Sequence, residues 1–210
     1  MCRFANKRRV VLYVSILLIS FTSCSPKLEL DERVTAYQEA HNKGNVKKEL
    51  SFFAEDVKFE LVGQRKMEGK ALLRNFVESD ATLNSHLILT DVKVHNNKVT
   101  CKVTEKNDYY KLAGIDALNY EYREFTFEKG LITEMRSQLT EESAKALQDF
   151  GASFAEWAME NRRDKLVELR REGVISKDNV GEWLDLLRAW REGMEQKEQE
   201  ESEKSEKEEQ

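Results

Sequence analysis

The stretch YQEAHNKGN at residues 37–45, followed by LSFFAEDV at residues 50–57, decides the fold of this chain. The apolar and aromatic positions of the first stretch recur at helical spacing, which predicts a helix with Asp31 as its N-cap. Gly44 is expected to end this helix, because glycine readily takes the left-handed conformation. A second short helix is expected from Val46 to about Phe53. Two short helices therefore precede the first strand.

The following segments predict a sheet with one more helix. Residues 57–62, VKFELV, alternate apolar and polar side chains as a strand does. A third helix is expected after Gly69. Two β-hairpins are expected across turns rich in Asn and Gly, one joining 87–94 to 98–104 and one joining 119–127 to 131–138, with a loop at 107–117 between them. This order predicts an α+β fold over residues 31–139, in which helices pack on one face of a strongly curved antiparallel sheet.

The last third of the chain returns to helical periodicity. Phe150, Phe154 and Trp157 lie at steps of three and four, so residues 140–193 are expected to form a helical extension. The extension also contains Trp183 and Trp190. These tryptophans could pack with one another, cover the domain before them, or anchor a partner. Residues 194–210 are rich in Glu and Lys and are expected to be an acidic tail, either a frayed helix or disordered.

Composition and charge limit the classes of function. The chain has 210 residues and is 40% hydrophobic, which is enough to build a core and excludes wholesale disorder. It carries 34 Lys and Arg against 39 Asp and Glu, for a formal net charge of −5. Because nucleic-acid binding depends on neutralising phosphates with basic side chains, this acidic balance argues against a nucleic-acid partner.

The N-terminus has the features of an export signal. Arg3, Lys7, Arg8 and Arg9 precede an apolar run at residues 10–21, which is too short to span a bilayer as a helix. Residues 21–24, FTSC, resemble the lipobox of bacterial lipoproteins. That resemblance implies a signal peptide at residues 1–23 and a lipidated Cys24 carrying acyl chains such as palmitate. A spacer at 24–30 would then hold the mature domain outside the cytoplasm, in the cell envelope or periplasm.

The other cysteines and the spacing of the histidines predict no metal site and no nucleophile. Cys2 lies in the expected leader, so Cys101 is the single thiol of the mature domain, and its alternating strand predicts a small buried side chain. The three histidines are scattered, and no metal-ligand spacing appears. No phosphate-binding glycine loop or nucleophile motif appears either. No metal and no cofactor are therefore expected.

The quoted stretches resemble the nuclear transport factor two-like superfamily, which includes the SnoaL-like proteins and ketosteroid isomerase. The shared pattern is an aromatic residue in the first helix, a small Gly-Asn step, and an apolar pair before Ala-Glu-Asp and a strand. Gly69-Lys70 resembles the start of the third helix of that family. The resemblance covers residues 31–139 and implies a cone-like domain with an open mouth. Residues 141–192 are similar to a helical extension found on some SnoaL-like bacterial proteins.

The resemblance to ketosteroid isomerase implies candidate site residues. Tyr37 falls at the position of the oxyanion-binding tyrosine, and Glu60 at that of the catalytic carboxylate. The third family position falls near Arg123, which cannot replace a neutral carboxylic acid but could bind an anionic ligand or pair with Glu60. His41 lies on the same helix face as Tyr37 and is a further ligand-binding candidate. If Phe59 and the apolar residues of its strand face the core, however, Glu60 faces solvent.

The sequence is compatible with three functions. The leading hypothesis is a membrane-anchored lipoprotein whose cone binds a small apolar ligand, or a protein partner, without catalysis. The alternative is an isomerase, cyclase or dehydratase with Glu60 as base and Tyr37 as hydrogen-bond donor. A third possibility is a homodimer formed through the open face of the sheet.

Overall fold

The structure is a computed structural model that describes residues 29–173 and 175–208. The expected leader and Cys24 lie outside the described residues. The helices and strands follow one another as α1 (Leu30–Asn42), α2 (Val46–Leu50), β1 (Phe53–Leu61), β2 (Arg65–Glu68), α3 (Lys70–Thr82), β3 (His86–His95), β4 (Lys98–Lys106), α4 (Asp108–Leu112), β5 (Leu118–Glu128), β6 (Leu131–Leu139), α5 (Glu141–Asn161), α6 (Arg163–Glu172) and α7 (Val180–Glu208).

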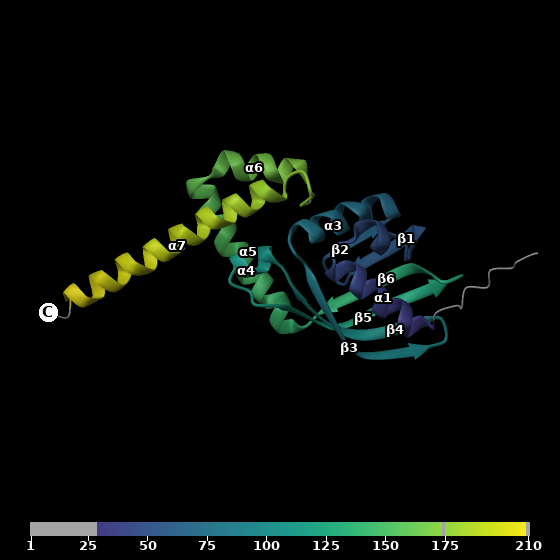
Figure 1. Cartoon of the computed structure of the whole chain (residues 1–210). Helices are drawn as coiled ribbons and strands as arrows, with labels where there is room; N and C mark the ends of the chain where they lie inside the picture. The colour runs from purple at the N-terminus through teal and green to yellow at the C-terminus, as the bar shows by residue number, and fades with distance from the viewer. Residues whose placement is uncertain (1–28, 174, 209–210) are drawn as a thin grey trace, which may run out of the picture.

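The strands form one six-stranded sheet in the order β2-β1-β6-β5-β4-β3. Strands β1 and β6 run parallel, whereas the other neighbouring pairs are antiparallel. Register shifts interrupt four of the five pairs, and such bulges bend the strands. Figure 1 shows the resulting curved sheet. The predicted α+β fold with a curved sheet is confirmed, except that the sheet is mixed rather than wholly antiparallel.

Helices α1 and α3 cover the sheet. Helix α1 packs on β3 and β4, and α3 packs on β1 and β2. The buried residues of α1 include Val34, Tyr37, Ala40 and His41, which are the positions expected from the helical spacing. Gly44 has a φ of 59°, so it takes the left-handed conformation expected at the end of this helix. Together with the concave face of the sheet, the two helices enclose the main core.

Several boundaries differ from those expected. Helix α1 begins at Leu30, and its N-cap is Glu29 rather than Asp31. The Glu29 backbone N–H donates a hydrogen bond to the Glu32 side chain at 3.2 Å, as in a capping box. Strand β1 begins at Phe53 rather than at residue 57, since Phe53 pairs with Ile132 of β6. The short elements β2 and α4 were not predicted from the sequence.

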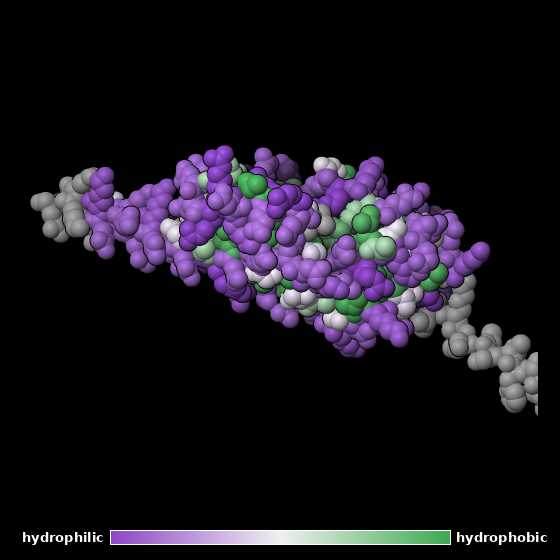
Figure 2. All heavy atoms as spheres, turned by 90° about the horizontal axis from the view of Figure 1, so that it is seen from above, coloured by the Kyte–Doolittle hydropathy of each residue, from purple (hydrophilic) through white to green (hydrophobic). Residues whose placement is uncertain are grey.

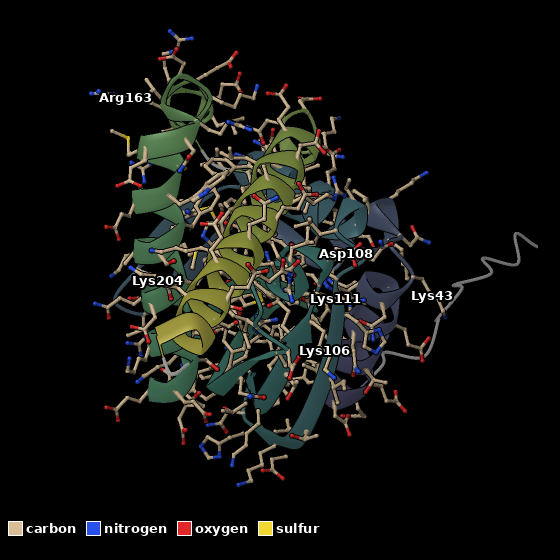
Figure 3. The ribbon with its side chains drawn as sticks, turned by 90° about the vertical axis from the view of Figure 1, so that its left-hand side faces the viewer. Lys43, Lys106, Asp108, Lys111, Arg163 and Lys204 are labelled. Atoms are coloured by element: carbon tan, nitrogen blue, oxygen red, sulfur yellow. The ribbon has the colours of Figure 1, made fainter. Side chains whose placement is uncertain are left out.

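The C-terminal helices form a second core beside the first. Phe154, Leu166, Leu169, Trp183 and Leu187 are buried in it, and the partly buried Trp157 and Trp190 pack against it. The tryptophans therefore pack with their own extension. Figure 3 shows α7 crossing in front of the sheet and beside α5, and the Arg191 guanidinium reaches the backbone carbonyls of Lys111 and Leu112 at 3.4 Å.

The end of α7 projects away from the rest of the molecule (Figure 1). The described part of the expected tail continues this helix to Glu208, and its residues are exposed from 195 to 205. Of the two alternatives left open for the tail, the structure shows a helix. No helix among residues 29–173 and 175–208 is both long and apolar enough to cross a membrane.

The face of the molecule shown in Figure 2 is mostly hydrophilic. In Figure 2 the hydrophobic atoms form small, separated patches among charged and polar side chains. The large apolar side chains that are exposed include Ile88 and Val94 on the edge strand β3 and Leu72 on α3. Scattered exposed apolar residues of this kind are normal on a soluble domain.

Candidate functional site

A cavity of about 380 Å³ lies between α1, α3 and the concave face of the sheet, and it reaches α5 at one side. Pockets of roughly 300 to 1,000 Å³ are typical of small-molecule sites. Its apolar walls include Phe59, Leu61, Met67, Leu73, Phe76 and Leu147. The three tryptophans are not among its lining residues, so the extension does not fill the cavity with indole rings.

One end of the cavity is polar. Its lining includes the side chains of Tyr37, His41, Glu49, Asp80, Glu105, Tyr110, Tyr120 and Arg123. These residues come from α1, α2, α3, α4, β4 and β5, so distant parts of the sequence converge there. We call this set the polar cluster. Its members differ in whether their polar atoms are already hydrogen-bonded.

His41 is fully engaged. Its Nδ1 lies 3.0 Å from Glu49 Oε1 and its Nε2 lies 3.0 Å from Ser85 Oγ, and all three residues are buried. Burial alone lowers the pKa of the imidazole, but the hydrogen bond and charge of Glu49 outweigh it, so the pKa of His41 is raised. A protonated ring would neutralise Glu49. His41 therefore lines the cavity with both ring nitrogens occupied.

Glu105 and Tyr120 form a second buried pair. The Tyr120 hydroxyl donates a hydrogen bond to Glu105 Oε2 at 2.8 Å. The guanidinium of Arg123 stacks over the Tyr120 ring at 4.9 Å from its centroid, a cation–π geometry. Arg123 Nε donates to Ser137 Oγ at 2.9 Å. The two strands β4 and β5 thus hold one carboxylate and one guanidinium at the same end of the cavity.

Asp80, on α3, faces this end of the cavity. Burial raises the pKa of its carboxyl from the ordinary 3.8 to about 7, and the charge of Glu105 adds to the rise. His41 and Arg123 act in the opposite direction. Within the described residues, Asp80 makes neither a side-chain hydrogen bond nor an ion pair. Near neutral pH its carboxyl can therefore hold or release a proton.

Tyr37 is the aromatic residue of the first quoted stretch. It is 2% exposed and makes edge-to-face contacts with Phe53 and Phe125, at centroid distances of 5.7 and 5.5 Å. Burial raises the pKa of its hydroxyl well above its usual range, so the hydroxyl stays protonated and can only be a neutral donor or acceptor. It lines the cavity, as the family resemblance implies.

Glu60 faces away from the cavity. Its strand neighbours Phe59 and Leu61 line the cavity, and alternation along β1 places Glu60 on the opposite face of the sheet. There it forms ion pairs of 3.2 Å with Lys66 and with Arg136. The structure therefore corrects the placement of Glu60 beside Tyr37, and it does not pair Glu60 with Arg123.

Sequence reasoning missed Asp80 and Glu105, although a signal for both exists. Asp80 continues the apolar stripe of α3, three residues after the buried Val77. Glu105 continues the buried alternation of Val99, Cys101 and Val103 on β4. A carboxylate at a position where the periodicity predicts an apolar residue is unusual, because burial of its charge is costly.

The remaining chemistry-bearing residues give no site. Cys101 is buried, its Sγ lies 3.7 Å from the Arg123 carbonyl oxygen, and burial raises the pKa of its thiol to about 11. Such a thiol is inert at neutral pH. In the part of the chain that the structure describes, His, Cys, Asp and Glu nowhere gather in a group of three or more suited to a metal ion.

Comparisons with known proteins find similarity to solved structures. No protein-family profile matches the chain, and no curated protein matches it either. One similar solved structure is that of SalBIII, described as an epoxide hydrolase/cyclase-like enzyme in pyran ring formation in the polyether salinomycin. The similarity covers 54% of this chain and 92% of SalBIII, with 21% identity and a TM-score of 0.48.

Two further solved structures are similar to the same extent. An NTF2-like protein of unknown function from Cytophaga hutchinsonii covers 56% of this chain and 96% of its own, with 14% identity and a TM-score of 0.47. An LEH-like epoxide hydrolase of M. tuberculosis covers 59% and 92%, with 14% identity and a TM-score of 0.47. Of these three structures, the one from Cytophaga hutchinsonii is described as NTF2-like and the other two as epoxide hydrolase-like. Their activities are properties of those proteins.

Proposed function

We propose that this chain binds one small, largely apolar molecule in the cavity between α1, α3 and the sheet. The observation that carries the proposal is the cavity itself, whose volume of about 380 Å³ lies behind apolar walls with a polar cluster at one end. Ligand sites of proteins combine these two features, because apolar walls supply affinity and a few polar groups supply orientation.

The polar cluster supports binding better than a purely structural role. A core that served stability alone would engage its buried polar groups with one another, since an unmade buried hydrogen bond is costly. Here Asp80 and the Tyr37 hydroxyl have no hydrogen-bond partner among the described residues, yet both line the cavity. A ligand with a polar group would satisfy them.

We further propose that the binding domain is held at a membrane by a lipid on Cys24. This part rests on the FTSC sequence at residues 21–24 and the basic, apolar leader before it. Two or more acyl chains give durable attachment, whereas one chain gives only marginal binding. The cavity would then face the cell envelope, where apolar molecules need a carrier or a receptor.

A calorimetric titration with octanol tests the binding proposal. The full-length chain would carry Cys24→Ser, so that no lipid has to be kept in detergent. Leu147 lines the cavity from α5, and Leu147→Trp should fill part of it. Val167 on α6 is 53% exposed, so Val167→Trp is a matched control.

We expect saturable binding of one octanol per chain, weakened at least about tenfold by Leu147→Trp and unchanged by the control, since overfilling excludes the ligand. Absence of saturable binding to the unfilled cavity would refute the proposal. Equal affinity in the two tryptophan variants would place the octanol elsewhere on the surface.

A further inference from the structure

Arg123 is a buried cation that forms no ion pair with a described residue, although the charge of Glu105 acts on it from a distance. Its side chain makes one hydrogen bond among the described residues, from Nε to Ser137 Oγ, and no ion pair with a described carboxylate. The residue is 5% exposed. A buried charge that lacks a direct partner is costly, and a ligand anion would supply that partner.

The free end of the guanidinium opens onto the cavity. Among the described residues, the fully enclosed side-chain nitrogens and oxygens that lack a partner belong to Arg33, Trp183 and Trp190 only. The terminal nitrogens of Arg123 are not in that group, and Arg123 lines the cavity. Their N–H groups therefore point to space that a ligand can fill.

The Tyr37 hydroxyl is a second hydrogen-bond donor without a partner at the polar end of the cavity. Tyr37 is buried, and its hydroxyl makes no hydrogen bond within the described residues. The hydroxyl oxygen is not among the fully enclosed atoms that lack a partner, so it is accessible from the cavity. Arg123 lines the same cavity, and its charge acts on the Tyr37 hydroxyl. Guanidinium and phenol together form a donor set suited to a carboxylate oxygen pair.

The surrounding charges oppose a bound anion least when the Asp80 carboxyl is neutral. Asp80 is faced by Glu105 from β4, Glu49 from α2, His41 from α1 and Arg123 from β5, with Tyr110 of α4 and Arg65 of β2 also on the cavity wall. His41 pairs with Glu49, whereas Glu105 accepts a hydrogen bond from Tyr120 and makes no ion pair with Arg123. A neutral Asp80 carboxyl is a third donor, whereas an ionised one would repel an incoming carboxylate.

The apolar walls fix the rest of the ligand. The cavity of about 380 Å³ has room for roughly a dozen water-sized groups at about 30 Å³ each. Phe59, Leu61, Phe76 and Leu147 offer no polar partner to the part of a ligand that lies against them. The body of the ligand is therefore a short aliphatic chain or a compact ring.

We infer that the cavity takes a monocarboxylate with an apolar body, that the Arg123 guanidinium and the Tyr37 hydroxyl hold its carboxylate, and that the ligand shares one proton with the Asp80 carboxyl. This inference rests on the proposed function and names its ligand class. An amine is disfavoured because the Arg123 cation lies at the same end. A dianion such as a phosphate monoester would add a second negative charge beside Glu105 and Glu49.

The inference predicts a defined pH dependence. The Asp80 carboxyl is protonated below pH 7 and ionised above it, while a carboxylate ligand is ionised throughout the range from about pH 6 to 9. Because the ligand binds together with the proton on Asp80, affinity falls as pH rises, by up to about tenfold per pH unit above 7. Loss of the His41 proton acts in the same direction.

Calorimetry with octanoate, octanol and octylamine on the full-length Cys24→Ser protein tests the inference. These probes share one chain and differ in the charge of the head group. We expect octanoate to bind at least about tenfold more tightly than the other two at pH 6, since hydrogen bonds to charged groups are the stronger ones. Octanol or octylamine binding as tightly as octanoate would overturn the inference and leave the proposed function standing. No binding by any probe would refute both.

Variants separate the roles of the residues. Tyr37→Phe removes one hydroxyl without a change of shape and should weaken octanoate about tenfold with little effect on octanol. Tyr122→Phe, on a residue of β5 outside the cavity, is the matched control and should change neither affinity. Asp80→Asn should remove the steep part of the pH dependence. A fall as steep as that of the unsubstituted protein, or no effect of Tyr37→Phe on octanoate, would overturn the inference.

Discussion

Asp80→Asn should stabilise the folded chain at alkaline pH. The pKa of the Asp80 carboxyl is about 7 in the folded state and 3.8 ordinarily. Between these values the folded state holds a proton that the unfolded chain releases, so the free energy of unfolding falls as pH rises through this window. The difference corresponds to roughly 4 kcal/mol once the group is fully ionised, and this is an upper bound because Asp80 is only partly buried.

Urea denaturation at about pH 5 and pH 8.5 measures this effect, because these values lie on either side of the folded-state pKa. At the higher pH the variant should be more stable than the unsubstituted protein by a few kcal/mol, and at the lower pH the gap should shrink. The raised pKa of His41 also favours folding at low pH; it rests mainly on Glu49, which both proteins keep, and the substitution removes only the smaller contribution of the Asp80 charge. Asp56→Asn, at an exposed position of β1, is the matched control and should show no such gap. An equal free-energy difference at both pH values would show that Asp80 is not the buried, proton-holding group described.

Three further outcomes follow from the C-terminal helices and the leader. Gly193→Ala should destabilise the chain by about 1 to 3 kcal/mol, because the added Cβ would lie 2.7 Å from Trp157 Nε1. Gly181→Ala in the same helix meets no atom within 4 Å and should stabilise the chain by about 1 kcal/mol. Thermal denaturation of the two variants measures both effects. Removal of residues 196–210 should change the free energy of unfolding by less than about 0.5 kcal/mol, because the described side chains there are exposed, and a loss of several kcal/mol would contradict that description. Cys24→Ser should release the protein from the membrane fraction of bacteria that express it, and retention of the variant after a high-salt wash would argue against the lipid anchor.

The sequence predicted the elements with strong periodicity. Helix α3 after Gly69, both hairpins and the long helices of the extension lie close to the expected ranges. The short elements α4 and β2 escaped notice because four or five residues carry too few repeats to show a period. The parallel pairing of β1 with β6 also could not be read from local patterns, since it joins residues far apart in the chain.

The candidate site was predicted in part. Tyr37, His41 and Arg123 do line one cavity, while their roles in binding stay predictions. The alternation of β1 left two facing directions open for Glu60, and only the packing of Phe59 against the core decides between them. Asp80 and Glu105 occupy positions where the periodicity of α3 and β4 predicts apolar residues. A search for functional side chains among the polar positions therefore does not find them.

The cavity between α1, α3 and the sheet is proposed to hold one small molecule by its polar head and its apolar body. A crystal structure of the full-length Cys24→Ser protein grown with octanoate would show whether it does. We expect one octanoate in the cavity, with its carboxylate within hydrogen-bond distance of Arg123 and its chain along the apolar walls. Octanoate bound only on the outer surface, or a cavity that holds nothing but water at saturating ligand, would refute this mode of binding.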